Sequence, residues 1–114
     1  MTHDTVRAMP QRFAPLSLAK IRKYEPQARA RGVSEVARSR GGFLPAYRRA
    51  GGRLSDMSRA PDGTPWPKKR AAFLRRHLAQ MIQNREPLFE ESGRPTRRHL
   101  ALIMWGYSPA ARRL

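Results

Sequence analysis

The chain has 114 residues and is 39% hydrophobic, which leaves room for one small domain with one modest core. Its 24 Lys and Arg residues outnumber its 8 Asp and Glu residues, so the formal net charge at pH 7 is +16. The absence of cysteine excludes disulfides, thiol catalysis and cysteine-ligated zinc, and the longest apolar run, residues 100–107, is too short to cross a bilayer.

Residues 1–15 lack hydrophobic periodicity and are basic, which predicts an extended basic N-terminal arm. A single small helical domain is expected over 16–109, followed by a basic tail over 110–114. No stretch has a convincing strand pattern, and the short apolar run at 87–89 is the best candidate for one. The sequence therefore predicts a mainly α protein of about four or five short helices.

Three short helical stretches are predicted before residue 41. The first, 17–24, is interrupted at Glu25-Pro26, because proline disfavours helical geometry in the residue before it. A further turn follows the proline and is closed by Gly32. Ser34 then begins another short helix as its N-cap. The apolar positions of this last helix are Val33, Val36 and Ala37.

The segment GGFLPAYRRAGG (41–52) predicts a helix between two glycine hinges. Pro45 is tolerated in a first helical turn, and Gly51 can adopt the left-handed conformation that ends a helix. A glycine-rich phosphate loop is rejected here, because neither a Walker pattern nor a preceding strand is present. The expected apolar face consists of Phe43, Leu44, Tyr47 and Ala50.

Residues 53–67 form the main irregular connection, and Trp66 is expected to fold back from it onto the next helix. That helix, predicted from 67 to 84, is the longest and carries one apolar stripe. A last helix is predicted from Thr96, its cap, to Trp105. The stripe of the long helix consists of Phe73, Leu74, His77, Leu78, Met81 and Ile82. The last helix is expected to bury Leu100, Ile103, Met104 and Tyr107.

The pentapeptide RRHLA occurs at 75–79 and again at 97–101. Little similarity extends beyond the pentamer, and no further copy continues a regular period, so we interpret the repetition as coincidence. The first arginine pair lies in the middle of a predicted helix, whereas the second follows the Thr96 cap. The second copy is therefore the better candidate for function.

Cations are concentrated in the first turns of the two C-terminal helices. These positions lie beside the positive end of the helix dipole and its free amides, where helices bind phosphate. We therefore predict an anion site at each helix start; the alternative is that the side chains only solvate the surface. The cations concerned are Arg97, Arg98, Lys68, Lys69 and Arg70.

The histidines and carboxylates indicate neither catalysis nor a bound cofactor. His77 and His99 are in phase with apolar helix positions, so both are interpreted as structural. With His3 as the remaining histidine, the chain has too few ligands for a metal site. No Ser or Thr has a spacing that marks a partner base, and the acids at 86–91 are interpreted as a solvated patch. We expect a non-enzymatic protein with no catalytic, cofactor-binding or metal-binding residues.

Acid-free runs rich in arginine are the strongest functional signal and lie at 36–55, 63–85 and 92–114. A chain this basic is expected to bind DNA or RNA through phosphate contacts whose strength falls as salt rises. Besides the cations at the two helix starts, the side chains assigned to this surface are Arg75, Arg76, Arg48 and Arg49.

Three segments carry a family resemblance: GGFLPAYRRAGG, then KKRAAFLRRHLAQ, then EPLFEESGRPTRRHLALIMWGYSP. Together they resemble a small basic family of uncharacterised proteins from bacteriophages and bacteria, over residues 36–109. The resemblance implies a phage-related context, in the cytoplasm of a bacterial cell or in a virion. It implies no catalytic residue.

Two alternatives to nucleic-acid binding stay open. The first is an interaction protein, an inhibitor or regulator, that binds an acidic protein surface and orders its basic ends on binding. The second is a basic structural component of a ribonucleoprotein or virion, in which the charge neutralises RNA or DNA. None of the three readings involves a membrane.

Overall fold

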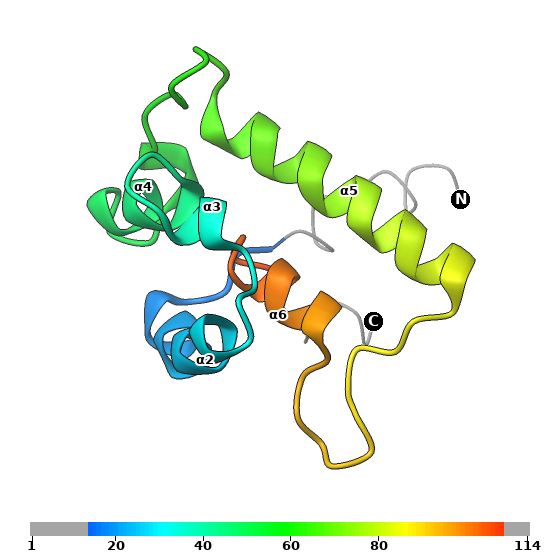
Figure 1. Cartoon of the computed structure of the whole chain (residues 1–114). Helices are drawn as coiled ribbons and strands as arrows, with labels where there is room; N and C mark the ends of the chain where they lie inside the picture. The colour runs from blue at the N-terminus through cyan, green and yellow to red at the C-terminus, as the bar shows by residue number, and fades with distance from the viewer. Residues whose placement is uncertain (1–13, 109–114) are drawn as a thin grey trace.

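The computed structural model describes residues 14–108, and this part of the chain is mainly helical, as predicted (Figure 1). In chain order it contains helices α2 (Leu18–Ala30), α3 (Glu35–Arg38) and α4 (Phe43–Arg49), the 3-10 helix η1 (Leu54–Asp56), and helices α5 (Trp66–Asn84) and α6 (Arg97–Ile103). Within the described range β-structure is limited to isolated bridges. The predicted basic tail and all but the last two residues of the predicted arm lie outside it.

Helix α6 lies at the centre of the fold and packs against both α2 and α5 (Figure 1). Leu100, Ile103 and Met104 enter the larger core, which is shared with α2 and α4. Leu102 enters a second, smaller core under α5, where Tyr107 is also fully buried. The predicted apolar face of the last helix is therefore confirmed, and it serves two cores. No helix between residues 14 and 108 is long and apolar enough to cross a membrane.

Helix α5 confirms the predicted long helix, with a start one residue earlier. Trp66 is the first helical residue and is buried, so it does not fold back from the loop as expected; Pro67 suits the first turn, where its missing N–H costs nothing. Leu74 and Met81 are buried, but Ile82, at the end of the predicted stripe, is 70% exposed.

Helix α2 corrects the prediction that proline breaks the first helix. Pro26 lies inside a continuous helix of 13 residues. The proline removes one backbone hydrogen bond, but Ile21 and Ala28, on either side of it, are both buried and hold the two halves against one core. Packing thus outweighs the local preference. The helix ends at Gly32, which has a φ of 63°, as predicted.

Helix α3 corrects two predictions, and helix α4 confirms the predicted helix and its end. Ser34 is not a side-chain cap for α3: its φ of 55° is left-handed and its hydroxyl makes no capping hydrogen bond. Val36, expected on the apolar face, is 78% exposed. Helix α4 begins after Gly42, where an added Cβ would lie 2.1 Å from the carbonyl oxygen of Val36, so only glycine allows this contact. Gly51 ends the helix at positive φ, as predicted.

The chain builds the same turn before α5 and before α6. In the first turn (59–65), Ala60 N–H donates to the Thr64 carbonyl at 2.8 Å; in the second turn (89–95), Glu90 N–H donates to the Arg94 carbonyl at 2.8 Å. Each turn closes an antiparallel bridge that ends on a proline and contains one glycine at positive φ. Both helix starts are therefore positioned by equivalent backbone geometry.

The two ends of the described chain are joined by a set of contacts that we call the end clasp: residues 14–16 against 105–107, with Arg70 between them. Leu16 N–H donates to the Gly106 carbonyl at 2.7 Å. The Arg70 guanidinium donates to the carbonyls of Trp105 at 2.7 Å, Gly106 at 2.9 Å and Ala14 at 3.3 Å. The clasp fixes the position of α6 and of the start of α5.

Candidate functional site

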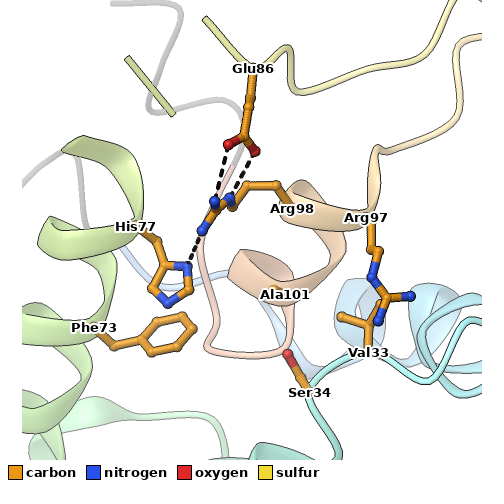
Figure 2. A pocket seen from close by; sticks show the side chains of 8 residues that line it. All are labelled: Val33, Ser34, Phe73, His77, Glu86, Arg97, Arg98 and Ala101. Atoms are coloured by element: carbon orange, nitrogen blue, oxygen red, sulfur yellow. Dashed lines mark hydrogen bonds and ion pairs between the residues drawn. The ribbon is translucent and has the colours of Figure 1, made fainter. Parts of the chain in front are cut away.

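A pocket of about 440 Å³ lies where α5, α6 and the connection from α2 to α3 meet (Figure 2). The segments that line it are far apart in the sequence, so only the packing of α6 against α5 creates it. Its lining side chains are Phe73 and His77 from α5, Arg97, Arg98 and Ala101 from α6, Val33 and Ser34 from the connection, and Glu86 from the loop after α5.

Arg98 is held in a network on the α5 side of the pocket (Figure 2). Its Nε and Nη2 donate to the two carboxylate oxygens of Glu86 at 2.9 and 3.0 Å, and Nη1 donates to Gln80 Oε1 at 3.0 Å. The hydrogen bonds with Glu86 raise the pKa of Arg98 and lower the pKa of the carboxylate. The charge of Arg98 is thus compensated by an acid, and its guanidinium is fixed in place.

His77 accepts a hydrogen bond at the edge of this network. Arg98 Nη1 lies 2.8 Å from His77 Nδ1, and because arginine can only donate, the proton of the neutral imidazole is on Nε2. Burial, then the charges of Arg98 and Arg76, lower the pKa of His77, with Glu86 opposing them. The histidine is therefore neutral at physiological pH and offers one N–H donor.

A stack of aromatic rings forms the same wall. The His77 ring lies 4.0 Å from that of Phe73, and the Phe73 ring lies 4.4 Å from that of Trp105, with interplanar angles of 27° and 15°. Trp105 in turn stacks on Phe43 at 5.3 Å. Because the stack continues into the core, Phe73 and His77 present a rigid apolar wall.

Arg97 lines the opposite wall of the pocket, and Arg31 and Arg38 lie next to it at the connection from α2 to α3. Arg97 Nη1 donates to the carbonyl of Arg31, and Arg38 Nε donates to the carbonyl of Val33 at 3.0 Å. The side chain of Ser34 points toward the pocket (Figure 2). We call Arg31, Arg38 and Arg97 the arginine rim.

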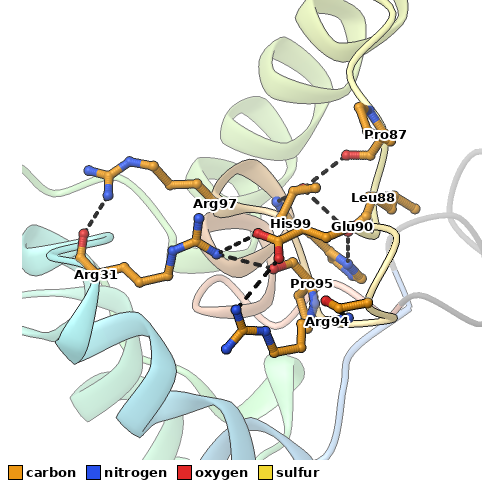
Figure 3. Close-up of polar contacts among 10 residues, drawn as sticks. Arg31, Pro87, Leu88, Glu90, Arg94, Pro95, Arg97 and His99 are labelled. Carbon is orange, nitrogen blue, oxygen red and sulfur yellow. Dashed lines mark hydrogen bonds and ion pairs between the residues drawn. The ribbon is translucent and has the colours of Figure 1, made fainter.

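The loop before α6 is tied down by polar contacts (Figure 3). Arg31 Nη1 donates to Glu90 Oε2 at 3.2 Å and to the Pro95 carbonyl at 3.3 Å. Thr96 caps α6 by accepting from the N–H of His99 at 3.2 Å, which confirms the predicted cap. His99 itself is fully buried, 2.9 Å from the Leu88 carbonyl, as expected for a structural histidine. These contacts fix where Arg97 and Arg98 enter the pocket.

The start of α5 differs from the predicted anion site. Arg70 is 2% exposed and is engaged by the end clasp, so it is removed from any phosphate-binding surface. Burial lowers its pKa to about 10, which leaves it charged at neutral pH. Lys69 lies 2.7 Å from Asp62, and this hydrogen bond, with one from Thr64, lowers the pKa of Asp62 to about 2. Of the three predicted cations, Lys68 is the one that stays exposed and forms no ion pair within residues 14–108.

The remaining predicted cations lie on two helices. Arg75 and Arg76 are exposed on the outer face of α5, and Arg49 is exposed at the end of α4. None of these three forms an ion pair with another described residue. Arg48, by contrast, pairs with Glu25 of α2. The structure therefore brings Arg97 and Arg98 together at the pocket and leaves the other exposed cations spread over α4 and α5.

Sequence reasoning missed several residues of the site. Val33 and Ser34 line the pocket through a connection whose path no local pattern reveals, and Arg31 and Arg38 flank that connection. Phe73 is part of the recognised apolar stripe, yet that stripe gave no sign that one side of the ring borders a pocket. In the described part of the chain, no group of three or more His, Asp or Glu side chains could hold a metal ion.

Comparison with known proteins adds no further constraint. No family profile, curated protein or solved structure matches this chain. The resemblance to a phage and bacterial family therefore stays a prediction.

Proposed function

We propose that this protein is a non-enzymatic nucleic-acid-binding protein that grips the phosphate backbone with exposed arginine and lysine side chains. The observation that carries the proposal is uncompensated charge. The chain has a net charge of +16, and five of the predicted cations are exposed without an ion pair among the described residues. They are Lys68, Arg75, Arg76, Arg49 and Arg97. Such a surface attracts polyanions and releases their counterions on binding.

The kind of cation supports phosphate as the target. Lysine occurs only at positions 20, 23, 68 and 69, so arginine supplies most of the positive charge. The guanidinium group binds phosphate through two parallel hydrogen bonds, whereas an ammonium acts as a point charge. We place this binding in the cytoplasm of a bacterial cell or in a virion, in keeping with the family resemblance.

The test is the salt dependence of binding to a short DNA duplex and to a single strand of the same sequence. Replacing Arg75 and Arg76 together by Gln should weaken binding to every sequence and reduce the slope of log K against log salt by about 0.9 for each lost duplex phosphate contact. The matched control replaces Arg48 and Lys69 by Gln. It removes the same charge from cations that already pair with acids, and it should change the slope less than half as much.

Two results would contradict the proposal. One is wild-type protein whose affinity for both nucleic acids is negligible in low salt. The other is a slope that the two double variants change equally, because binding would then depend on net charge and not on the outer face of α5. A preparation free of absorbance at 260 nm that captures one acidic protein would support the interaction-protein alternative instead.

A further inference from the structure

The pocket between α5 and α6 is built for more than a phosphate. Its volume of about 440 Å³ falls in the range of about 300–1,000 Å³ typical of small-molecule sites, well above what one phosphate group fills. One wall is aromatic, formed by Phe73 and His77, and Ala101 lines the pocket from α6. A ligand that fits must have a flat apolar part as well as a charge.

The charge that the pocket favours is negative, and Arg97 is its anchor. The charge of Arg98 is compensated by Glu86, whereas Arg97 is exposed, donates to the backbone carbonyl of Arg31 and forms no ion pair with another described residue. Arg38, which donates to the carbonyl of Val33 beside the same wall, adds positive charge there, whereas Arg31 is paired with Glu90. Ser34 adds a hydroxyl that points toward the pocket (Figure 2) and is not used as a helix cap.

We propose that this pocket receives one unpaired nucleotide of a single-stranded nucleic acid, with the base packed along the side of the ring stack formed by Phe73 and His77 and the phosphate at Arg97. This inference rests on the proposed function and deepens it. Bases within a duplex are stacked and cannot enter such a pocket, whereas an unpaired base can leave the stack and pack on protein rings. The pocket therefore gives the protein a preference for single strands that its surface charge alone does not supply.

The variant that tests the proposal fills the pocket without changing any charge. Ala101→Phe should lower affinity for a 20-nucleotide single strand by about tenfold, the typical loss for one stacked base, and leave affinity for the duplex within about twofold. The matched control is Ala79→Phe, at an exposed position of α5, which should leave both affinities unchanged. Circular dichroism and thermal unfolding establish that each variant is folded.

A measurement on the wild-type protein makes the test independent of folding. In NMR titrations, adenosine 5′-monophosphate should shift the Ala101 methyl and His77 ring signals at concentrations at least about tenfold lower than inorganic phosphate does. Equal effects of the two compounds, or shifts that spare these two residues, would overturn the nucleotide pocket.

The two proposals fail in different ways. A wild-type protein that binds neither single strand nor duplex refutes the proposed function and this inference with it. A protein that binds both with steep salt dependence, and whose ratio of affinities is the same in the wild type and in Ala101→Phe, keeps the proposed function and loses only the pocket.

Discussion

The first and second turns share one backbone geometry, yet the cations that follow them are used in opposite ways. After the first turn, Lys69 reaches back to Asp62 of that same turn. After the second turn, where Ser92 takes the place of the aspartate, Arg98 reaches across to Glu86 and His77. The carboxylate of the first turn therefore pairs with Lys69, whereas the equivalent position after the second turn is the buried His99. Arg98, one residue earlier, pairs with Glu86 from a distant segment and lines the pocket.

Burial sharpens the same contrast. At the start of α5 the guanidinium of Arg70 is buried in the end clasp, whereas at the start of α6 the side chain of Arg97 is exposed. Hydrogen bonds from a charged donor to buried carbonyls are strong and costly to leave unmade. The first helix start thus serves stability, and the second serves the candidate site.

The largest effect is expected from replacing Arg70. Arg70→Met removes the donor for three carbonyls and should lower the free energy of unfolding by about 3–5 kcal/mol, measured by urea denaturation. Lys68→Met, at an exposed position of the same helix start, should change it by no more than about 0.5 kcal/mol. Similar losses in the two variants would mean that the hydrogen bonds of Arg70 in the end clasp do not stabilise the fold more than an exposed cation does.

The next effect concerns the acid of the first turn. NMR titration should give Asp62 a pKa of about 2, below its ordinary value of 3.8, and Lys69→Met should raise it. Because the folded-state pKa is depressed, the pair stabilises the fold above pH 4 and loses this contribution as the pH falls toward 2. Ser92→Asp places a carboxylate in the second turn. Its pKa should lie nearer 3.8, because the position that corresponds to Lys69 is occupied by the buried His99, which cannot pair with it. A pKa near 2 there as well would remove lysine as the cause.

A smaller shift is expected at His77. Its pKa should lie below 6.5, and Arg98→Gln should raise it, because the substitution removes a nearby positive charge. Since the folded protein disfavours the charged imidazole, its stability should fall as the pH drops below 6.5. NMR titration of the ring protons measures both effects. If Arg76→Gln raises the pKa more than Arg98→Gln does, Arg98 is not the main positive charge that acts on the imidazole besides burial.

The smallest effect is expected where α5 ends and the path to the second turn begins. Arg85 has a φ of 55°, a conformation that costs an ordinary residue energy and glycine none. Arg85→Gly should raise the free energy of unfolding by about 0.5–1 kcal/mol, measured in urea. Arg76→Gly, in the middle of the same helix, should lower it by about 1 kcal/mol. A loss in both variants would show that the left-handed residue is not strained.

The sequence predicts the helical elements of this fold well where local rules and packing agree. The stripe of α5 as far as Met81, the Thr96 cap and the Gly51 and Gly32 helix ends each follow from a short sequence pattern and are confirmed, whereas Ile82 at the end of the stripe is exposed. The rule fails at Pro26, because burial on both sides of the proline decides the outcome. It fails again at Ser34, which has a left-handed backbone and makes no capping hydrogen bond.

The site is harder to predict, since its parts meet only in three dimensions. Arg97 and Arg98 are found from a cap and a charge pattern, both local. Arg70 carries the same pattern and is buried, because whether a cation faces solvent depends on which neighbours offer it acceptors. Repeated sequence and repeated structure also do not coincide. The two RRHLA segments occupy different parts of their helices, whereas the two turns have the same backbone geometry although their sequences share little more than a glycine and a proline.

The end clasp determines when, during synthesis on the ribosome, this fold can close. The carbonyls of Trp105 and Gly106 are needed by Leu16 and Arg70, which leave the ribosome much earlier. Until the last helix has emerged, the Arg70 guanidinium and the backbone N–H of Leu16 lack their acceptors in residues 105 and 106. The end clasp therefore forms only after residues 105–107 have been synthesised. In a circularly permuted chain, with residues 14 and 108 joined by a short linker and the new termini placed at the exposed Gly63, the clasp could form before the rest of the fold.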